Sequence, residues 1–207
     1  MNTYAQHEED LFIFNLIKRL DLPITPSFID LGACDGIHMS NTRLFAEIGW
    51  SGVFVEPSKH YFKQLQENYS HRKNINTINA AIGPLNGKVE FYFNPKNPDL
   101  SSIIGFDGAE KYYVDVITFN KLFCNPKFNN TGILSIDVEG IDTLILKAAL
   151  ESDIDIQIII IEGNTLDIRK YQIEILNKDY HLLNTLSVNT IWIKRNLYEK
   201  YNRSTEL

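Results

Sequence analysis

The stretch FIDLGACDGIHMSNT, residues 28–42, decides the fold of this chain. It begins with an apolar run that ends on the carboxylate of Asp30, continues through a loop that holds Gly32 and Gly36, and ends in a polar cluster. A buried strand that opens into a glycine-containing loop before a helix is typical of open α/β sheets that bind small molecules. Glycine lets the backbone of such a loop approach a ligand closely. We therefore expect a ligand site at the end of this first strand.

Apolar runs of the same kind recur along the chain and predict the rest of the sheet. They lie at 52–57, 75–83, 132–140 and 156–164, and helical patterns lie at 7–20, 58–69, 116–123, 142–150 and 167–178, with a further helix capped by Ser40 or Asn41. Nearly continuous apolar strands that alternate with helices are typical of a parallel sheet covered on both faces. The strands at 181–186 and 190–194 are too close for a helical crossover, so they predict an antiparallel hairpin at the sheet edge.

Between these units the chain carries an added strand at 87–93 and an irregular stretch at 94–111. The irregular stretch is rich in Asn, Pro and Gly, which favours a loop. Long loops in compact domains are often functional. This loop is therefore a candidate lid over the acceptor, the second molecule that would bind beside the ligand.

Length and composition fit one globular domain over residues 1–207. The net charge of −6 provides no basic footprint, so no nucleic-acid partner is expected. No stretch reaches the roughly 18 apolar residues that span a bilayer, so we expect no membrane partner. The acidic first ten residues do not resemble a signal peptide, so we expect a cytoplasmic protein. Cys34 and Cys124 fit reduced thiols rather than a disulfide framework. The sequence contains no indication of oligomeric state.

Carboxylates follow four of the five expected parallel strands. They are Asp30 and Asp35 after the first strand, Glu56 after the second, Asp137 and Glu139 after the fourth, and Glu162 after the fifth. The carboxyl ends of parallel strands meet at one edge of the sheet, where ligands bind. Each acid taken alone could equally cap the following helix. The set as a whole favours a binding site.

The glycine loop departs from the dinucleotide fingerprint G-x-G-x-x-G, because Cys34 stands where the second glycine would face a pyrophosphate. Asp35 would repel a pyrophosphate and attract an amine or a sulfonium. Glu56 lies 20 residues beyond Gly36, where a carboxylate can accept both ribose hydroxyls. Together these residues predict a nucleoside with a positively charged tail, which points to S-adenosylmethionine.

Six segments of the chain, in order, resemble class I methyltransferases of the FkbM type. They are YAQHEED (4–10), FIDLGACDGIHMSNT (28–42), GWSGVFVEP (49–57), ITF (117–119), ILSIDVEG (133–140) and IIIIEGN (158–164). The resemblance implies a Rossmann-like class I methyltransferase fold, with a seven-stranded, mostly parallel sheet, a C-terminal antiparallel hairpin and helices on both faces. It also implies O-methyl transfer from S-adenosylmethionine to a hydroxyl of a sugar, a glycan or a related small molecule. Ala5, Glu8 and Asp142 stand where the family often has Ser, Gly and Glu.

The resemblance implies a role for each part of the cofactor site. Gly32, Ala33, Asp35 and Gly36 would hold the methionine end, Ser40 and Asn41 would add polar contacts, Glu56 would bind the ribose, and Pro57, Ala80 and Ala81 would line the adenine. Gln6, Asp30, Cys34 and Asp137 complete the expected set, with Asp137 where the methyl donor meets the acceptor. The N-terminal helical segment 1–26 is expected to pack over this site, residues 27–195 to form the Rossmann-like core, and residues 196–207 to form a tail.

Methyl transfer to a hydroxyl needs an aligned nucleophile, and a base or a metal to activate it. Asp137, Glu139 and His38 are the candidate bases, although a partly exposed loop residue is the simpler interpretation of His38. Asp137, Glu162 and Asn164 offer three oxygen ligands on adjacent strand ends, which would suit a divalent metal such as magnesium. Without a metal, Glu162 and Asn164 would instead shape the acceptor pocket.

Two other functions are consistent with the same sheet. One is a non-catalytic protein that binds S-adenosylmethionine or acts as a scaffold, against which the carboxylates beside an intact cofactor loop count weakly. The other is an NAD-type oxidoreductase, which the missing G-x-G-x-x-G and the terminal hairpin disfavour.

Overall fold

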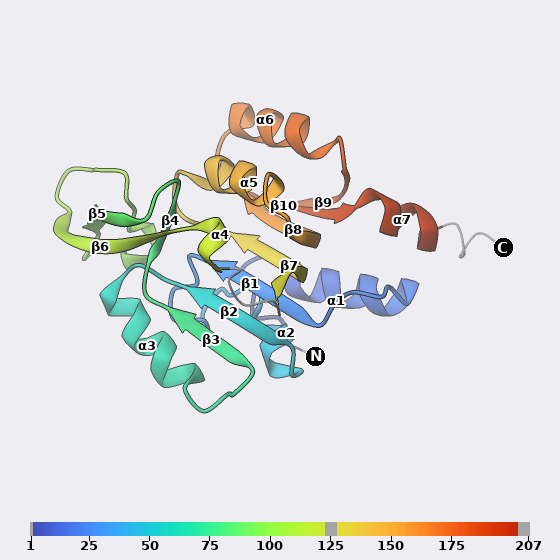
Figure 1. Cartoon of the computed structure of the whole chain (residues 1–207), viewed down its shortest axis with the longest axis horizontal. Helices are drawn as coiled ribbons and strands as arrows, with labels where there is room; N and C mark the ends of the chain where they lie inside the picture. Colours follow the sequence, from blue (N-terminus) through green and yellow to red (C-terminus); the bar gives the residue numbers. More distant parts are fainter. Residues whose placement is uncertain (1, 123–127, 203–207) are drawn as a thin grey trace.

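The computed structural model describes residues 2–122 and 128–202, and its centre is a seven-stranded sheet with the order β3-β2-β1-β7-β8-β10-β9 (Figure 1). The parallel strands are β1 (Ser27–Leu31), β2 (Ser51–Val55), β3 (Ile75–Ile78), β7 (Asn130–Ile136) and β8 (Asp155–Glu162). β10 (Asn189–Lys194) pairs antiparallel with both β8 and β9 (Tyr180–Leu186). The predicted fold class, a mostly parallel sheet with a terminal antiparallel hairpin, is confirmed.

Helices cover both faces of this sheet because each strand directs alternate side chains to opposite sides. Ile159 and Ile161 of β8 face the layer of α4 (Phe119–Leu122), α5 (Asp142–Leu150) and α6 (Leu166–Leu176). Ile158 and Ile160 face the layer of α1 (Glu9–Leu20), α2 (Arg43–Glu47), α3 (Lys59–Tyr69) and α7 (Arg195–Asn202). Burial on both faces explains why these strands are apolar throughout.

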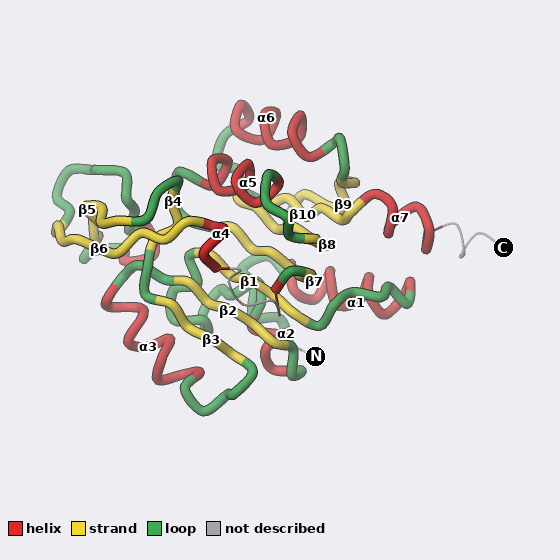
Figure 2. Tube along the Cα trace, in the orientation of Figure 1, coloured by secondary structure: helices red, strands yellow, loops and turns green. Residues whose placement is uncertain are grey.

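A second, three-stranded sheet with the order β4-β6-β5 lies beyond the carboxyl ends of the parallel strands (Figure 2). Its strands are β4 (Ala81–Gly83), β5 (Gly87–Phe93) and β6 (Glu110–Thr118). The single strand expected at 75–83 is therefore wrong, because the chain leaves the main sheet at Asn79 and Ala80. The side-chain amide of Asn79 donates to the carbonyl oxygens of Glu56 and Pro57, at 2.8 and 3.1 Å, and fixes this break.

The helix expected at 116–123 is also wrong for its first residues, which complete β6. Val114 of β6 is buried against Ala81 and Phe91, so tertiary contacts of the second sheet decide the strand conformation. The loop expected at 94–111 ends earlier, where β6 begins, and it contains the 3₁₀ turn η1 (Pro98–Leu100). The start of the expected tail is helical, as α7. Cys124 and residues 203–207 lie outside the described residues.

Candidate functional site

Two cavities open side by side at the carboxyl edge of the main sheet, around the point where β1 and β7 are neighbours and the strand order reverses. Ligands of open α/β sheets bind at such a switch point. Both cavities are lined by Gly32, Cys34, Asp99, Asp137 and Glu139, so these five residues mark the junction between them.

The first cavity is a mainly apolar slot, whose empty space together with the open solvent at its mouth is about 560 Å³. Four residues expected at a cofactor site, Glu56, Pro57, Ala80 and Ala81, line it together. Its other walls, which were not expected from the sequence, include Tyr61, Phe91, Asp99 and Ile103. Phe91 belongs to the second sheet and Asp99 and Ile103 to the loop between β5 and β6, so only the tertiary fold brings them to the strand ends.

The second cavity is larger, about 1270 Å³, and more polar. Its lining includes the expected residues Gln6, Asp30, Ala33, His38, Ser40, Asn41 and Glu162. Asn97, Ser135 and Asn189 also line it and were not expected. Ser135 could have been found, because it lies on β7 beside Asp30 of β1 in the parallel register.

The backbone of the glycine loop passes close to neighbouring residues at Gly32 and at Gly36. Gly32 has a φ of +82°, and a Cβ at this residue would lie 1.7 Å from the carbonyl oxygen of Asp137. Gly36 has a φ of +70°, and a Cβ there would meet Leu65 and Tyr69 of α3, each at 2.7 Å. Gly32 thus lets the loop cross the end of β7, whereas Gly36 lets the loop pack on α3.

Asp35 and Gly36 are not among the residues that line the two cavities, so their expected role as cofactor contacts stays a prediction. The Asp35 carboxylate accepts hydrogen bonds from the amides of Ile37 and His38, both at 2.8 Å. This short-range turn competes with any ligand for the same oxygen. Asp35 therefore shapes the loop from within.

The N-terminal end of α2 is held by side chains of the same stretch. Ser40 Oγ accepts the amides of Thr42 and Arg43, at 3.4 and 3.1 Å, so Ser40 stabilises this helix start although Thr42 is its N-cap residue. Thr42 Oγ1 donates to Asp30 Oδ2 at 2.6 Å, which ties the helix to β1. Burial raises the pKa of Asp30 to about 6, against the hydrogen bonds that lower it.

Glu56 is buried at the end of β2 and faces the apolar slot. Its Oε2 accepts the amide of Cys34 at 2.9 Å, and its Oε1 accepts the amide of Ser58 at 2.7 Å. Burial raises the pKa of Glu56 to about 7. Each carboxylate oxygen has a second lone pair, so Glu56 can still accept hydroxyl groups of a ligand.

Three acids lie at the junction or beside it, and no Lys or Arg lines either cavity among the residues that the structure describes. Burial raises the pKa of Asp137 well above its usual range, with further increases from Glu162 and Glu139. Burial and the charge of Glu162 raise the pKa of Glu139 to about 7, and burial also raises that of Glu162. Among the described residues, none donates a hydrogen bond to the Asp137 carboxylate. This arrangement would be relieved by a bound cation.

Carboxylate oxygens of Asp137, Asp142 and Glu162 lie within 4.8 Å of one another, close enough to hold one metal ion. The expected third ligand, Asn164, instead donates its side-chain amide to Glu162 Oε2 at 3.0 Å and lines neither cavity. Asp142 joins Asp137 and Glu162 because its carboxylate accepts the amides of Val138 and Gly140, which fixes it under the Asp137 turn, and Asn164 as a ligand stays a prediction. Oxygen ligands of this kind suit magnesium.

The N-terminal segment reaches the polar cavity through Gln6. Glu9 is fully buried, and its carboxylate accepts the Asn189 side-chain amide and the His7 amide, both at 2.8 Å. The pair Glu9–Asn189 thus fastens α1 to β10 close to the cavity.

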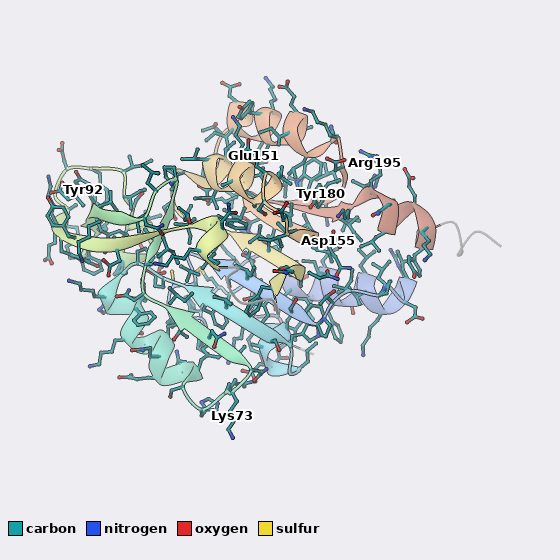
Figure 3. All side chains as sticks on the ribbon, viewed as in Figure 1. Lys73, Tyr92, Glu151, Asp155, Tyr180 and Arg195 are labelled. Carbon is teal, nitrogen blue, oxygen red and sulfur yellow. The ribbon has the colours of Figure 1, made fainter. Side chains whose placement is uncertain are left out.

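A third hollow lies away from the switch point, near Tyr180 and Arg195 (Figure 3). Arg195 donates to the carbonyl oxygens of Asn177 and Tyr180, at 2.7 and 2.8 Å, and Tyr180 donates to Ile156 O at 2.8 Å. These bonds join the start of α7 to β9 and β9 to β8 at this hollow.

In the part of the chain that the structure describes, none of the helices has both the length and the apolar character required to cross a membrane.

Comparison with known proteins gives one family and a set of similar folds. The model of a family described as the methyltransferase FkbM domain matches residues 30–187. No curated protein matches the chain significantly.

Several solved structures are similar to this chain at low sequence identity. The methyltransferase FkbM from Methylobacillus flagellatus KT is 16% identical, with a TM-score of 0.48, over 81% of this chain and 43% of that chain. Monomeric WbdD is 12% identical, with a TM-score of 0.50, over 91% of this chain and 41% of that one. The yhhF protein from Escherichia coli is 10% identical, with a TM-score of 0.51, over 93% of this chain and 88% of that chain. The match spans about two fifths of the first two proteins.

Proposed function

This chain belongs to the FkbM methyltransferase family, and from that premise we propose that it transfers the methyl group of S-adenosylmethionine to a hydroxyl of a sugar, a glycan or a related small molecule. One observation supports this proposal above all. The two joined cavities are lined by six carboxylates, Asp30, Glu56, Asp99, Asp137, Glu139 and Glu162, and by no Lys or Arg among the described residues. Such a site attracts a ligand with positive charge and repels phosphates.

The residues of the site fit each part of S-adenosylmethionine. The apolar slot beside Pro57, Ala81 and Phe91 suits the adenine ring, and Glu56 is placed to accept ribose hydroxyls. The polar cavity offers Asp30, Asn41 and Gln6 to an amino-acid tail. The sulfonium joins these two parts of the cofactor, so in this proposal it lies at the junction of the cavities.

The bound cofactor supplies an electrophilic methyl group, and the chain supplies alignment and a base. Glu139 lines both cavities, and its pKa of about 7 lets it accept a proton near neutral pH. His38 lines only the polar cavity, and its amide donates to Asp35 in the loop turn. We therefore place Glu139 first among the candidate bases.

A divalent metal held by Asp137, Asp142 and Glu162 is the second form of this proposal, supported by their closely spaced oxygens. A metal there would polarise the acceptor hydroxyl in place of a base. The test is methyl transfer before and after chelation with EDTA. Lost activity that magnesium restores would support the metal, and unchanged activity would exclude it.

Calorimetric titration tests the cofactor. We expect S-adenosylmethionine and S-adenosylhomocysteine to bind, and NAD, which carries a pyrophosphate, to give no heat. Binding of NAD in preference to both adenosyl compounds would instead favour an oxidoreductase.

Transfer of a labelled methyl group to neutral, amino and phosphorylated monosaccharides and to glycans then separates an enzyme from a non-catalytic binder. We expect labelled neutral or amino sugars, and little labelling of phosphorylated ones, because the polar cavity is acidic. Cofactor binding without labelled product from any acceptor would favour the scaffold function.

A further inference from the structure

Asp99 lies where the two cavities meet, although no strand end or glycine motif marks it in the sequence. It belongs to η1 in the loop between β5 and β6, beyond the carboxyl ends of the parallel strands (Figure 2). Ser102 of this loop donates its hydroxyl to the carbonyl oxygen of Glu139 at 2.5 Å and exchanges two backbone hydrogen bonds with Tyr92. These bonds hold the loop over the strand ends.

The Asp99 carboxylate is oriented by a neighbour in the apolar slot. Tyr61 of α3 donates its hydroxyl to Asp99 Oδ1 at 2.5 Å. Burial and this hydrogen bond raise the pKa of Tyr61 well above its ordinary value, so the phenol remains a donor at neutral pH. The second oxygen, Oδ2, has no hydrogen-bond partner among the described residues, and it is free to interact with a ligand.

The charge of Asp99 reaches the other groups of the junction. After burial, it is among the causes that raise the pKa of Cys34, Glu56 and Glu139. Asp137 lines the same junction with a carboxylate that has no hydrogen-bond donor in the described parts of the chain. Two carboxylates from different elements, a strand end and a loop, therefore face the place where the cavities join.

We propose that Asp99 recognises the positive charge of the sulfonium, so that the site distinguishes S-adenosylmethionine from S-adenosylhomocysteine. This inference rests on the proposed function. In methyl transfer the acceptor oxygen gains the methyl group and loses its proton to a carboxylate of the site, and the electron pair of the broken carbon–sulfur bond stays on sulfur. Sulfur thereby becomes neutral, and Asp99 loses its partner. The loop carrying Asp99 then holds the product less tightly than the substrate, which favours product release.

The test is the ratio of two dissociation constants, measured by calorimetry on the full chain. One ligand is S-adenosylhomocysteine, and the others are S-adenosylmethionine and sinefungin, which carries an ammonium group in place of the methylated sulfonium. Asp99→Asn keeps the size of the side chain and removes its charge. We expect the variant to lose about fivefold or more in affinity for both cationic ligands while its affinity for S-adenosylhomocysteine stays within about twofold.

Asp107→Asn is the matched control, because Asp107 is an exposed acid of the same loop that lines neither cavity. It should leave all three affinities unchanged. Tyr61→Phe removes the hydroxyl that orients Asp99, so it should lower the preference for cationic ligands in the same direction.

Other outcomes would overturn the inference. An equal loss of affinity for all three ligands in Asp99→Asn would show that Asp99 only supports the loop. Unchanged affinities would exclude a contact between Asp99 and the sulfonium. Both of these results would leave the proposed function intact, provided that the unmodified protein binds the cofactor. If the unmodified protein binds neither S-adenosylmethionine nor S-adenosylhomocysteine, the proposed function fails and this inference fails with it.

Discussion

At the scale of single residues, Gly32 carries two separate constraints, a left-handed backbone and contact with the end of β7. Gly32→Ala should therefore lower the free energy of unfolding by about 3 kcal/mol or more and abolish binding of S-adenosylhomocysteine. Denaturant unfolding and calorimetry measure the two effects.

Gly49→Ala is the control for Gly32→Ala. Gly49 has a φ of +93°, and a Cβ there would meet no atom within 4 Å. This variant isolates the backbone strain, which costs about 1–2 kcal/mol, and should bind the ligand normally. An equal loss in the free energy of unfolding for both variants would show that the contact of Gly32 with Asp137 does not contribute to stability.

Glu139 offers a test of the base. Because its pKa is about 7, the fraction of the carboxylate form rises as the pH passes through neutrality. We expect kcat/KM to rise with pH through this range, and Glu139→Gln to lower it by about 100-fold and to remove this pH dependence.

The matched control is Glu151→Gln, at an exposed acid that follows α5 (Figure 3). Its pH profile should equal that of the unmodified protein. If kcat/KM of Glu139→Gln still rises with pH, another group is the base. Asp137 and His38 are then the remaining candidates.

At the scale of elements, one buried polar pair, Glu9 and Asn189, joins α1 to β10. Asn189→Asp places a second carboxylate against buried Glu9, so repulsion should release the N-terminal segment and lower stability by about 2–3 kcal/mol. Gln6 would leave the polar cavity with this segment. Limited proteolysis should then cut the segment faster, and the affinity for S-adenosylhomocysteine should fall.

Asn196→Asp makes the same chemical change at an exposed residue and should alter neither property. If Asn189→Asp resists proteolysis as well as this control does, the pair does not fasten the segment.

At the scale of the whole molecule, the acidic site makes stability depend on pH. Burial raises the pKa of Asp30 from 3.8 to about 6 and that of Glu56 from 4.5 to about 7. Between these values the folded protein binds more protons than the unfolded chain, so the free energy of unfolding falls as pH rises. We expect it to be higher at pH 5.5 than at pH 7.5 by on the order of 2 kcal/mol.

Chemical denaturation at the two pH values measures this difference. Glu56→Gln, which is neutral at both, should reduce the difference markedly, whereas Glu67→Gln at an exposed acid of α3 should not. Greater stability at pH 7.5 than at pH 5.5 would contradict the expected linkage.

The sequence alone is sufficient to predict the central sheet, the glycine loop and the strand ends that form the site. These features depend on short-range signals: uninterrupted apolar strands, helices of regular period and glycine at a turn. Since parallel strands end at one edge, Asp30, Glu56, Asp137 and Glu162 could be placed near one another before the structure was known.

Which side chains face the cavities depends on how the elements pack in three dimensions. Asp35 accepts hydrogen bonds from amides of its own loop, and Asp142 lies with Asp137 and Glu162 although the sequence did not point to it. The second sheet and the loop that carries Asp99 are held by contacts between residues distant in the chain, such as Ser102 with Glu139 and Tyr61 with Asp99. The local pattern of apolar and polar residues does not predict such contacts, because they form only when separate elements pack together.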